Sequence, residues 1–117
     1  MLKIFNELEK ALNLPLIDIN AKNIDYDNII LFELDEITKQ RNISNKLNEY
    51  GLMVNLYYVT KESDQNHNKN SLNILSKLEL HNAKAIQNIT CSKLIIINAT
   101  KYLVTKYDLI FEATQIF

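Results

Sequence analysis

The chain has 117 residues, of which 47% are hydrophobic and 23% are charged, and its formal net charge at pH 7 is −1. This length and apolar content suit one domain, residues 1–117, with its own hydrophobic core, and argue against a disordered tail. The near-neutral charge and the single arginine, Arg41, argue against specific nucleic-acid binding, which favours basic surfaces and bidentate arginines.

The cysteine content and the hydropathy pattern indicate a cytoplasmic protein that is not secreted. The one cysteine, Cys91, cannot form an intrachain disulfide, which fits a reducing compartment. Polar residues interrupt Met1–Leu16, so this segment is not expected to be a signal peptide. No apolar run approaches the ~18 residues of a membrane-spanning helix, so no membrane contact is expected.

The first predicted helix lies at the N-terminal end of the sequence. Apolar side chains recur at helical spacing at Leu2, Phe5, Leu8 and Leu12. The helix should end near Asn13, because Pro15 disfavours helical backbone at the residue before it. The following segment, 16–27, is rich in Asn and Asp and is expected to be a connector.

A second helix is predicted after the polar segment Glu62–Asn70, which contains no apolar residue and is expected to be an exposed loop. Ser71 is the expected N-cap, because Leu72, Leu75 and Leu78 follow it at helical spacing. The C-terminal end of this helix falls between about Leu80 and Ala85.

Four further segments are rich in β-forming residues and alternate between two faces. The predicted strands are Asn28–Asp35, Tyr50–Lys61, Ile89–Ile97 and Tyr102–Phe117, the last being one long strand or a bent pair. A polar segment at Ile37–Glu49 is either a long hairpin loop or holds a helical turn. With one glycine in the chain, turns such as Asn98–Lys101 must depend on Asn and Asp.

These elements predict an α+β fold in the order helix, strand, strand, helix, strand, strand. The simplest arrangement is a mostly antiparallel sheet with both helices packed on one face. The sequence leaves open whether the last two strands pair as a hairpin.

The sequence lacks the usual signatures of catalysis, cofactor binding and metal binding. The single glycine excludes glycine-rich phosphate loops, and Cys91, His67 and His81 do not make a standard zinc set. A nucleophile–base pair of Cys91 and His81 is conceivable, but a core cysteine and a surface histidine are the simpler interpretation. We therefore expect no catalytic residues, no cofactor, no metal and no enzymatic activity.

Three neighbouring acids, Glu33, Asp35 and Glu36, stand at the end of a predicted strand. Paired carboxylates can serve acid–base chemistry or hold magnesium. The simpler interpretation is a solvated strand end whose charge discourages unwanted strand pairing.

Candidate contact residues for a protein partner come from the aromatic strand and from the two polar segments. Tyrosine is enriched in protein interfaces, and long polar loops in a small domain are often functional. His67 stands in the most polar segment and is expected to be solvated. The candidate interface residues are Tyr57, Tyr58, Arg41, Asn42, Asn66 and His67.

The sequence of elements resembles the tail-terminator and head–tail joining proteins of long-tailed bacteriophages. A short helix (LKIFNELEKAL) and a leucine–proline connector (NLPLIDI) precede two apolar strands (NIILFELDE and GLMVNLYYVTKE). A polar loop, a helix (SLNILSKL) and a terminal β segment (YLVTKYDLIFEATQIF) complete the pattern. The resemblance lies in element order and size, without a diagnostic motif, and the apolar residues within 82–100 depart from it.

This resemblance implies a non-enzymatic structural protein of the virion. Proteins of that family self-associate into a ring, commonly a hexamer, that contacts the tail tube and the head connector. Such a protein would assemble in the host cytoplasm and end in the virion. The alternative is a small regulatory or adaptor protein of the anti-defence, immunity or antitoxin type, which would bind one protein partner.

Overall fold

The computed structural model describes residues 3–39, 50–80 and 85–112, which form two helices and five strands. In chain order the elements are α1 (Lys3–Leu12), β1 (Leu16–Asp18), β2 (Ile29–Lys39), β3 (Tyr50–Lys61), α2 (His67–Leu80), β4 (Ala85–Ile97) and β5 (Thr100–Glu112). The predicted α+β class is confirmed.

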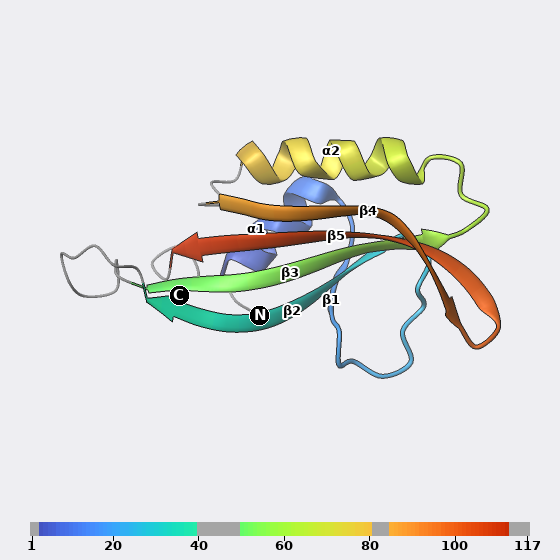
Figure 1. The fold of residues 1–117 in the computed structure, drawn as a ribbon, viewed down its shortest axis with the longest axis horizontal. Helices are drawn as coiled ribbons and strands as arrows, with labels where there is room; N and C mark the ends of the chain where they lie inside the picture. The colour runs from blue at the N-terminus through green and yellow to red at the C-terminus, as the bar shows by residue number, and fades with distance from the viewer. Residues whose placement is uncertain (1–2, 40–49, 81–84, 113–117) are drawn as a thin grey trace.

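The five strands form one mixed sheet in the order β1-β2-β3-β5-β4 (Figure 1). Only β1 runs parallel to its neighbour, and the β2–β3, β3–β5 and β5–β4 pairs are antiparallel. The strand β5 is thus last along the chain but lies between β3 and β4. The mostly antiparallel sheet is the predicted one.

The two last strands form a hairpin with a two-residue turn, because Ile97 pairs with Thr100. The intervening Asn98 and Ala99 both have positive φ, at 48° and 64°. Two successive positive φ values are the mark of a type I′ turn, whose twist matches that of a hairpin. This turn answers the question of pairing that the sequence left open.

Both helices pack against the same face of the sheet and share its main core (Figure 1). Helix α1 contributes Phe5, Leu8 and Leu12, which are spaced as one helical face. Helix α2 contributes Ile74 and Leu78. The strands add residues from alternate positions, namely Leu16, Ile30, Val54, Leu56, Tyr58, Tyr107, Leu109 and Phe111. The prediction that both helices cover one face is therefore confirmed.

The end of α1 follows the predicted signal. Asn13 has a positive φ of 54°, and its backbone N–H donates to the carbonyl of Glu9. This left-handed residue closes the helix in the way that glycine often does, and Asn tolerates it. Pro15 follows two residues later, where it cannot continue the helix.

Several predicted boundaries are wrong. β4 begins at Ala85 instead of Ile89, and β5 begins at Thr100 instead of Tyr102. The segment 16–27 was expected to be a connector, yet Leu16–Asp18 pairs with Ile30–Phe32 of β2 as a short parallel strand. The strand β2 also runs to Lys39 instead of ending at Asp35, with a register shift between Leu34 and Glu36. A bulge of this kind lets a strand continue through residues that interrupt its alternation.

The start of α2 is the largest correction. The helix begins at His67, so the expected loop Glu62–Asn70 ends four residues early and Ser71 is not the N-cap. The Asn70 N–H donates to the carbonyl of Asn66, which forms the first helical hydrogen bond.

No helix in the described ranges 3–39, 50–80 and 85–112 is both long and apolar enough to cross a bilayer.

Candidate binding groove and free sheet edge

The sheet face opposite the helices carries a second, smaller apolar cluster. Ile29, Leu31, Val59 and Val104 are buried at its centre. Partly buried apolar residues surround them, namely Ile17, Ile19, Ile24, Tyr26, Tyr57, Ile95 and Tyr102. No helix of the described residues covers this face, so part of its apolar surface is exposed to solvent.

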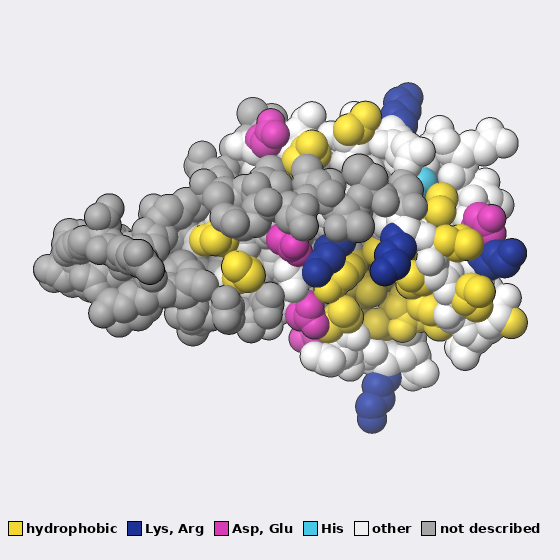
Figure 2. Space-filling model, in the orientation of Figure 1, with side chains coloured by type: hydrophobic (Ala, Val, Ile, Leu, Met, Phe, Trp, Pro, Cys, Tyr) yellow, Lys and Arg dark blue, Asp and Glu magenta, His cyan; other side chains and the backbone are white. Residues whose placement is uncertain are grey.

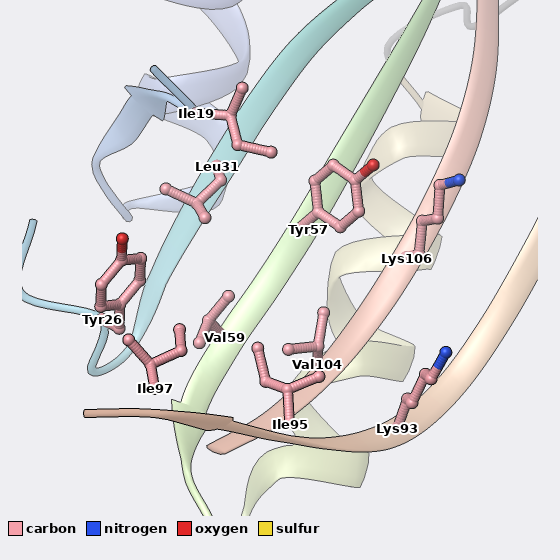
Figure 3. A pocket seen from close by; sticks show the side chains of 10 residues that line it. All are labelled: Ile19, Tyr26, Leu31, Tyr57, Val59, Lys93, Ile95, Ile97, Val104 and Lys106. Atoms are coloured by element: carbon pink, nitrogen blue, oxygen red, sulfur yellow. The ribbon is translucent and has the colours of Figure 1, made fainter. Parts of the chain in front are cut away.

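This face is hollowed into a groove with a volume of about 600 Å³. Its floor consists of Leu31, Tyr57, Val59 and Val104 from the three central strands (Figure 3). One wall comes from Ile19 and Tyr26 in the segment between β1 and β2, and the other from Ile95 and Ile97 on β4. Figure 2 shows apolar side chains lining this hollow, with basic side chains at its rim.

Lys93 of β4 and Lys106 of β5 form the basic rim of the groove (Figure 3). In the β4–β5 ladder Lys93 pairs with Val104, and Lys106 pairs with Thr90. The Lys106 Nζ lies 5.7 Å from the centre of the Tyr57 ring, within the range of a cation–π contact. It also lies 3.5 Å from Asp108 Oδ1. Among the described residues, Lys93 makes no ion pair and its side chain is exposed.

A carboxylate lies next to this rim. The Glu33 side chain accepts hydrogen bonds from the Tyr57 hydroxyl and from Asn55 Nδ2, each at 3.1 Å. These bonds hold the Tyr57 ring at the floor of the groove and satisfy Glu33. Glu33 is therefore a part-buried structural partner within β2, and the prediction of a solvated strand end is wrong for this residue.

The strand β4 is an edge of the sheet, because it pairs only with β5 among the described strands. Its N-terminal part departs from regular pairing between Ile86 and Asn88 and again between Thr90 and Lys93. From Lys93 to Ile97 the pairing is regular. Along this regular part Leu94 and Ile96 are 48% and 65% exposed, on the face opposite the groove. Exposed apolar side chains on a regular edge are a ready site for strand addition.

A buried polar cluster lies between α2 and the sheet, and His67 is at its centre. His67 is only 1% exposed, so the prediction of a solvated loop residue is wrong. Its Nδ1 lies 2.9 Å from the Thr60 hydroxyl and its Nε2 lies 2.9 Å from the Thr105 hydroxyl. Burial lowers the pKa of His67, against a smaller opposing effect of Asp64. The ring is thus a neutral structural group.

Tyr58 is also a core residue, with no exposed surface, and it cannot contact a partner directly. Its ring stacks on His67, and its hydroxyl donates to Asn28 Oδ1 and accepts from Asn70 Nδ2. Burial raises the pKa of the Tyr58 phenol above its ordinary value, although the hydrogen bond from Asn70 lowers it. Tyr57, on the opposite face of β3, is the half-buried tyrosine that lines the groove.

The remaining predicted residues are distributed as follows. Asn66 is exposed directly before α2, where its N–H donates to Asp64 Oδ1. Arg41, Asn42 and His81 lie outside the described residues. Cys91 belongs to β4, but the arrangement of a Cys91–His81 pair also falls outside them.

Within the described parts of the chain, no group of three or more His, Cys, Asp or Glu side chains could hold a metal ion.

No known family model matches the sequence, and no curated protein is significantly similar to it. The function must therefore be argued from the groove and from the β4 edge.

Sequence reasoning missed the groove for a clear reason. Strand alternation places the apolar floor residues on a second face of the sheet but does not indicate what covers that face. The walls come from a connector and from β4, which are distant in sequence from the floor. A usable signal was that β2 begins with apolar residues on both faces, as in Ile29, Ile30 and Leu31.

Proposed function

We propose that this chain is a non-enzymatic structural protein that self-associates through the free edges of its sheet. The proposed type is the tail-terminator or head–tail joining protein of a long-tailed bacteriophage, assembled in the host cytoplasm and carried in the virion. The observation that supports it most is the regular edge of β4, where Leu94 and Ile96 are exposed.

The composition of this edge favours pairing with another strand. Lys93–Ile97 contains three β-branched residues, no proline and a single charge, Lys93. A partner strand would use the outer backbone groups of β4 and cover the two exposed side chains. An isolated subunit has neither the backbone hydrogen bonds to a partner strand nor the burial of these two side chains.

The opposite edge of the sheet supports a head-to-tail contact between subunits. There β1 pairs only with Ile30–Phe32, so the rest of β2 has no strand on its outer side among the described residues. The sequence of that part includes Glu33, Asp35 and Glu36, whereas the β4 edge carries Lys93. Two β2 edges would place acid against acid, but a β2 edge and a β4 edge have complementary charges. Contacts between different surfaces close into rings when the rotation permits.

The test is the mass of the protein by light scattering on a sizing column, over a wide concentration range. Wild type is expected to grow toward a discrete ring-sized species, and Ile96→Glu is expected to remain monomeric. Leu72→Glu is the matched control, because Leu72 is 67% exposed, close to the 65% of Ile96, but belongs to α2 and not to the edge strand. The control should assemble like wild type.

Tail assembly can require the tail-tube protein, so the same measurement is repeated with that protein present. A wild-type monomer at every concentration, with and without the tail-tube protein, would contradict the proposal. Equal loss of assembly in Ile96→Glu and Leu72→Glu would contradict the edge as the interface.

The same edge also supports the second candidate, an adaptor that binds one protein partner. Strand addition to β4 can be made by a different protein as well as by a second copy. A stable monomer that forms a one-to-one complex with a non-virion enzyme, and loses it in Ile96→Glu, would favour this function.

A further inference from the structure

We infer that the groove on the open face of the sheet binds an unbranched aliphatic chain that ends in a carboxylate. This ligand site lies on the face opposite Leu94 and Ile96, and it shares Lys93, Ile95 and Ile97 of β4 with the proposed assembly edge. Three features of the groove carry the inference. Its lining is mostly apolar, the strands of its floor are paired with a neighbouring strand on both sides, and two lysines lie at its rim.

The lining and size fit a small apolar ligand. Eight of the ten lining residues are aliphatic or aromatic, and the other two are Lys93 and Lys106. The volume of about 600 Å³ lies within the range of ordinary ligand pockets, roughly 300–1,000 Å³. Two walls and a floor of apolar side chains would remove most of an alkyl chain from water, which is its main source of affinity.

The backbone of the floor argues against a peptide in the groove. Leu31 pairs with Ile17 and Tyr57, and Val59 pairs with Ile29 and Val104 on its two sides. Val104 likewise pairs on both sides, with Val59 and Lys93. A peptide laid on this floor would find no free backbone partners, and burying unpaired amides is costly. An alkyl chain has no such groups to satisfy.

The basic end selects the charge of the ligand head group. Lys93 and Lys106 approach the groove from two adjacent strands (Figure 3). Asp108 lies 3.5 Å from Lys106 and partly balances it, and Glu33 is hydrogen-bonded by Asn55 and Tyr57. Lys93 therefore supplies the charge that a carboxylate would meet first, with Lys106 as the second contact.

Three probes of equal chain length test the inference on the full-length wild-type protein. Laurate, dodecanol and dodecyltrimethylammonium are titrated below their micelle concentrations, with binding measured by calorimetry. Laurate is expected to bind at one site per chain, at least about tenfold more tightly than either other probe. Equal binding of all three, or no saturable binding of laurate, would overturn the inference.

Two lysine variants locate the head group. Lys93→Glu is expected to weaken laurate binding by about tenfold or more. Lys101→Glu is the matched control, because Lys101 is an exposed lysine of the same hairpin that does not line the groove. Unchanged binding in Lys93→Glu, or equal losses in both variants, would refute the assigned site. Light scattering on the same samples separates lost ligand binding from lost assembly.

Discussion

The ring of His67 stacks on the ring of Tyr58, with their centroids 4.9 Å apart and their planes 19° from parallel. This contact joins the first turn of α2 to the C-terminal half of β3. The Thr60 hydroxyl donates to the Lys61 carbonyl, so His67 Nδ1 must carry the ring proton and donate to Thr60. His67 Nε2 then accepts from Thr105, which fits a neutral ring.

Acidification should destabilise the protein through His67. Because burial lowers the pKa of His67 in the folded state, the unfolded chain binds a proton first as the pH falls. The contribution of the neutral ring is complete above pH ~6.5, the ordinary histidine pKa, and is lost as the pH falls toward the folded pKa. The melting temperature of wild type should therefore drop between about pH 7 and pH 5.

The matched variant for this prediction is His67→Gln, which keeps a polar side chain but does not titrate in this range. It should be less stable than wild type at pH 7, and its melting temperature should change less on acidification. Both proteins keep His81, so the difference between them reports on residue 67. Parallel pH profiles for the two proteins would show that His67 is not the group responsible.

Removing the Thr105 hydroxyl should destabilise the fold without creating a cavity. Its oxygen lies 2.9 Å from both His67 Nε2 and Ser71 Oγ, and the side chain is buried. Thr105→Val keeps the shape but leaves a buried ring nitrogen without its partner, at a cost of about 1–3 kcal/mol. Urea unfolding followed by far-ultraviolet circular dichroism would measure it. Thr100→Val, at an exposed position of the same strand, should change the free energy of unfolding little.

Ala99→Gly should stabilise the protein. Ala99 has φ of 64° in the type I′ turn, a conformation that is costly for a residue with a Cβ atom and free for glycine. The net gain should be about 0.5–1 kcal/mol, since glycine also makes the unfolded chain more flexible. Thermal unfolding would detect it as a higher melting temperature. The control is Ala21→Gly, at an exposed residue outside the positive-φ set, which should lower the melting temperature or leave it unchanged.

The sequence was most informative where a strand alternates regularly. The predicted Tyr50–Lys61 matches β3 at both ends, and Val54, Leu56 and Tyr58 share the helix-side core as their spacing required. The apolar residues of this strand repeat with period two, so the pattern in the sequence matches the side chains that are buried on the helix-covered face. The helix spacing of Phe5, Leu8 and Leu12 was informative for the same reason.

The sequence was least informative where long-range contacts decide the structure. His67–Asn70 shows no apolar periodicity, and its helical turn is fixed by polar contacts to Thr60, Thr105 and Tyr58 across the sheet. β1 is three residues long, and its pairing with β2 leaves no local pattern. For the candidate site, the sequence predicted Tyr57 as an interface residue, which stays a prediction. The structure places Tyr57 in the groove, and the sequence could not indicate the walls that surround it.

The position of β5 has a consequence for the order in which the protein can fold during synthesis. A nascent chain that has emerged only through Ile97 already contains β3 and β4, but the strand that separates them is still missing. Until β5 arrives, β3 has an open inner side and β4 has no partner at all. While β5 has not yet emerged, the nascent chain exposes strand edges with apolar side chains, and such intermediates are the species that chaperones bind and that aggregate when left unprotected.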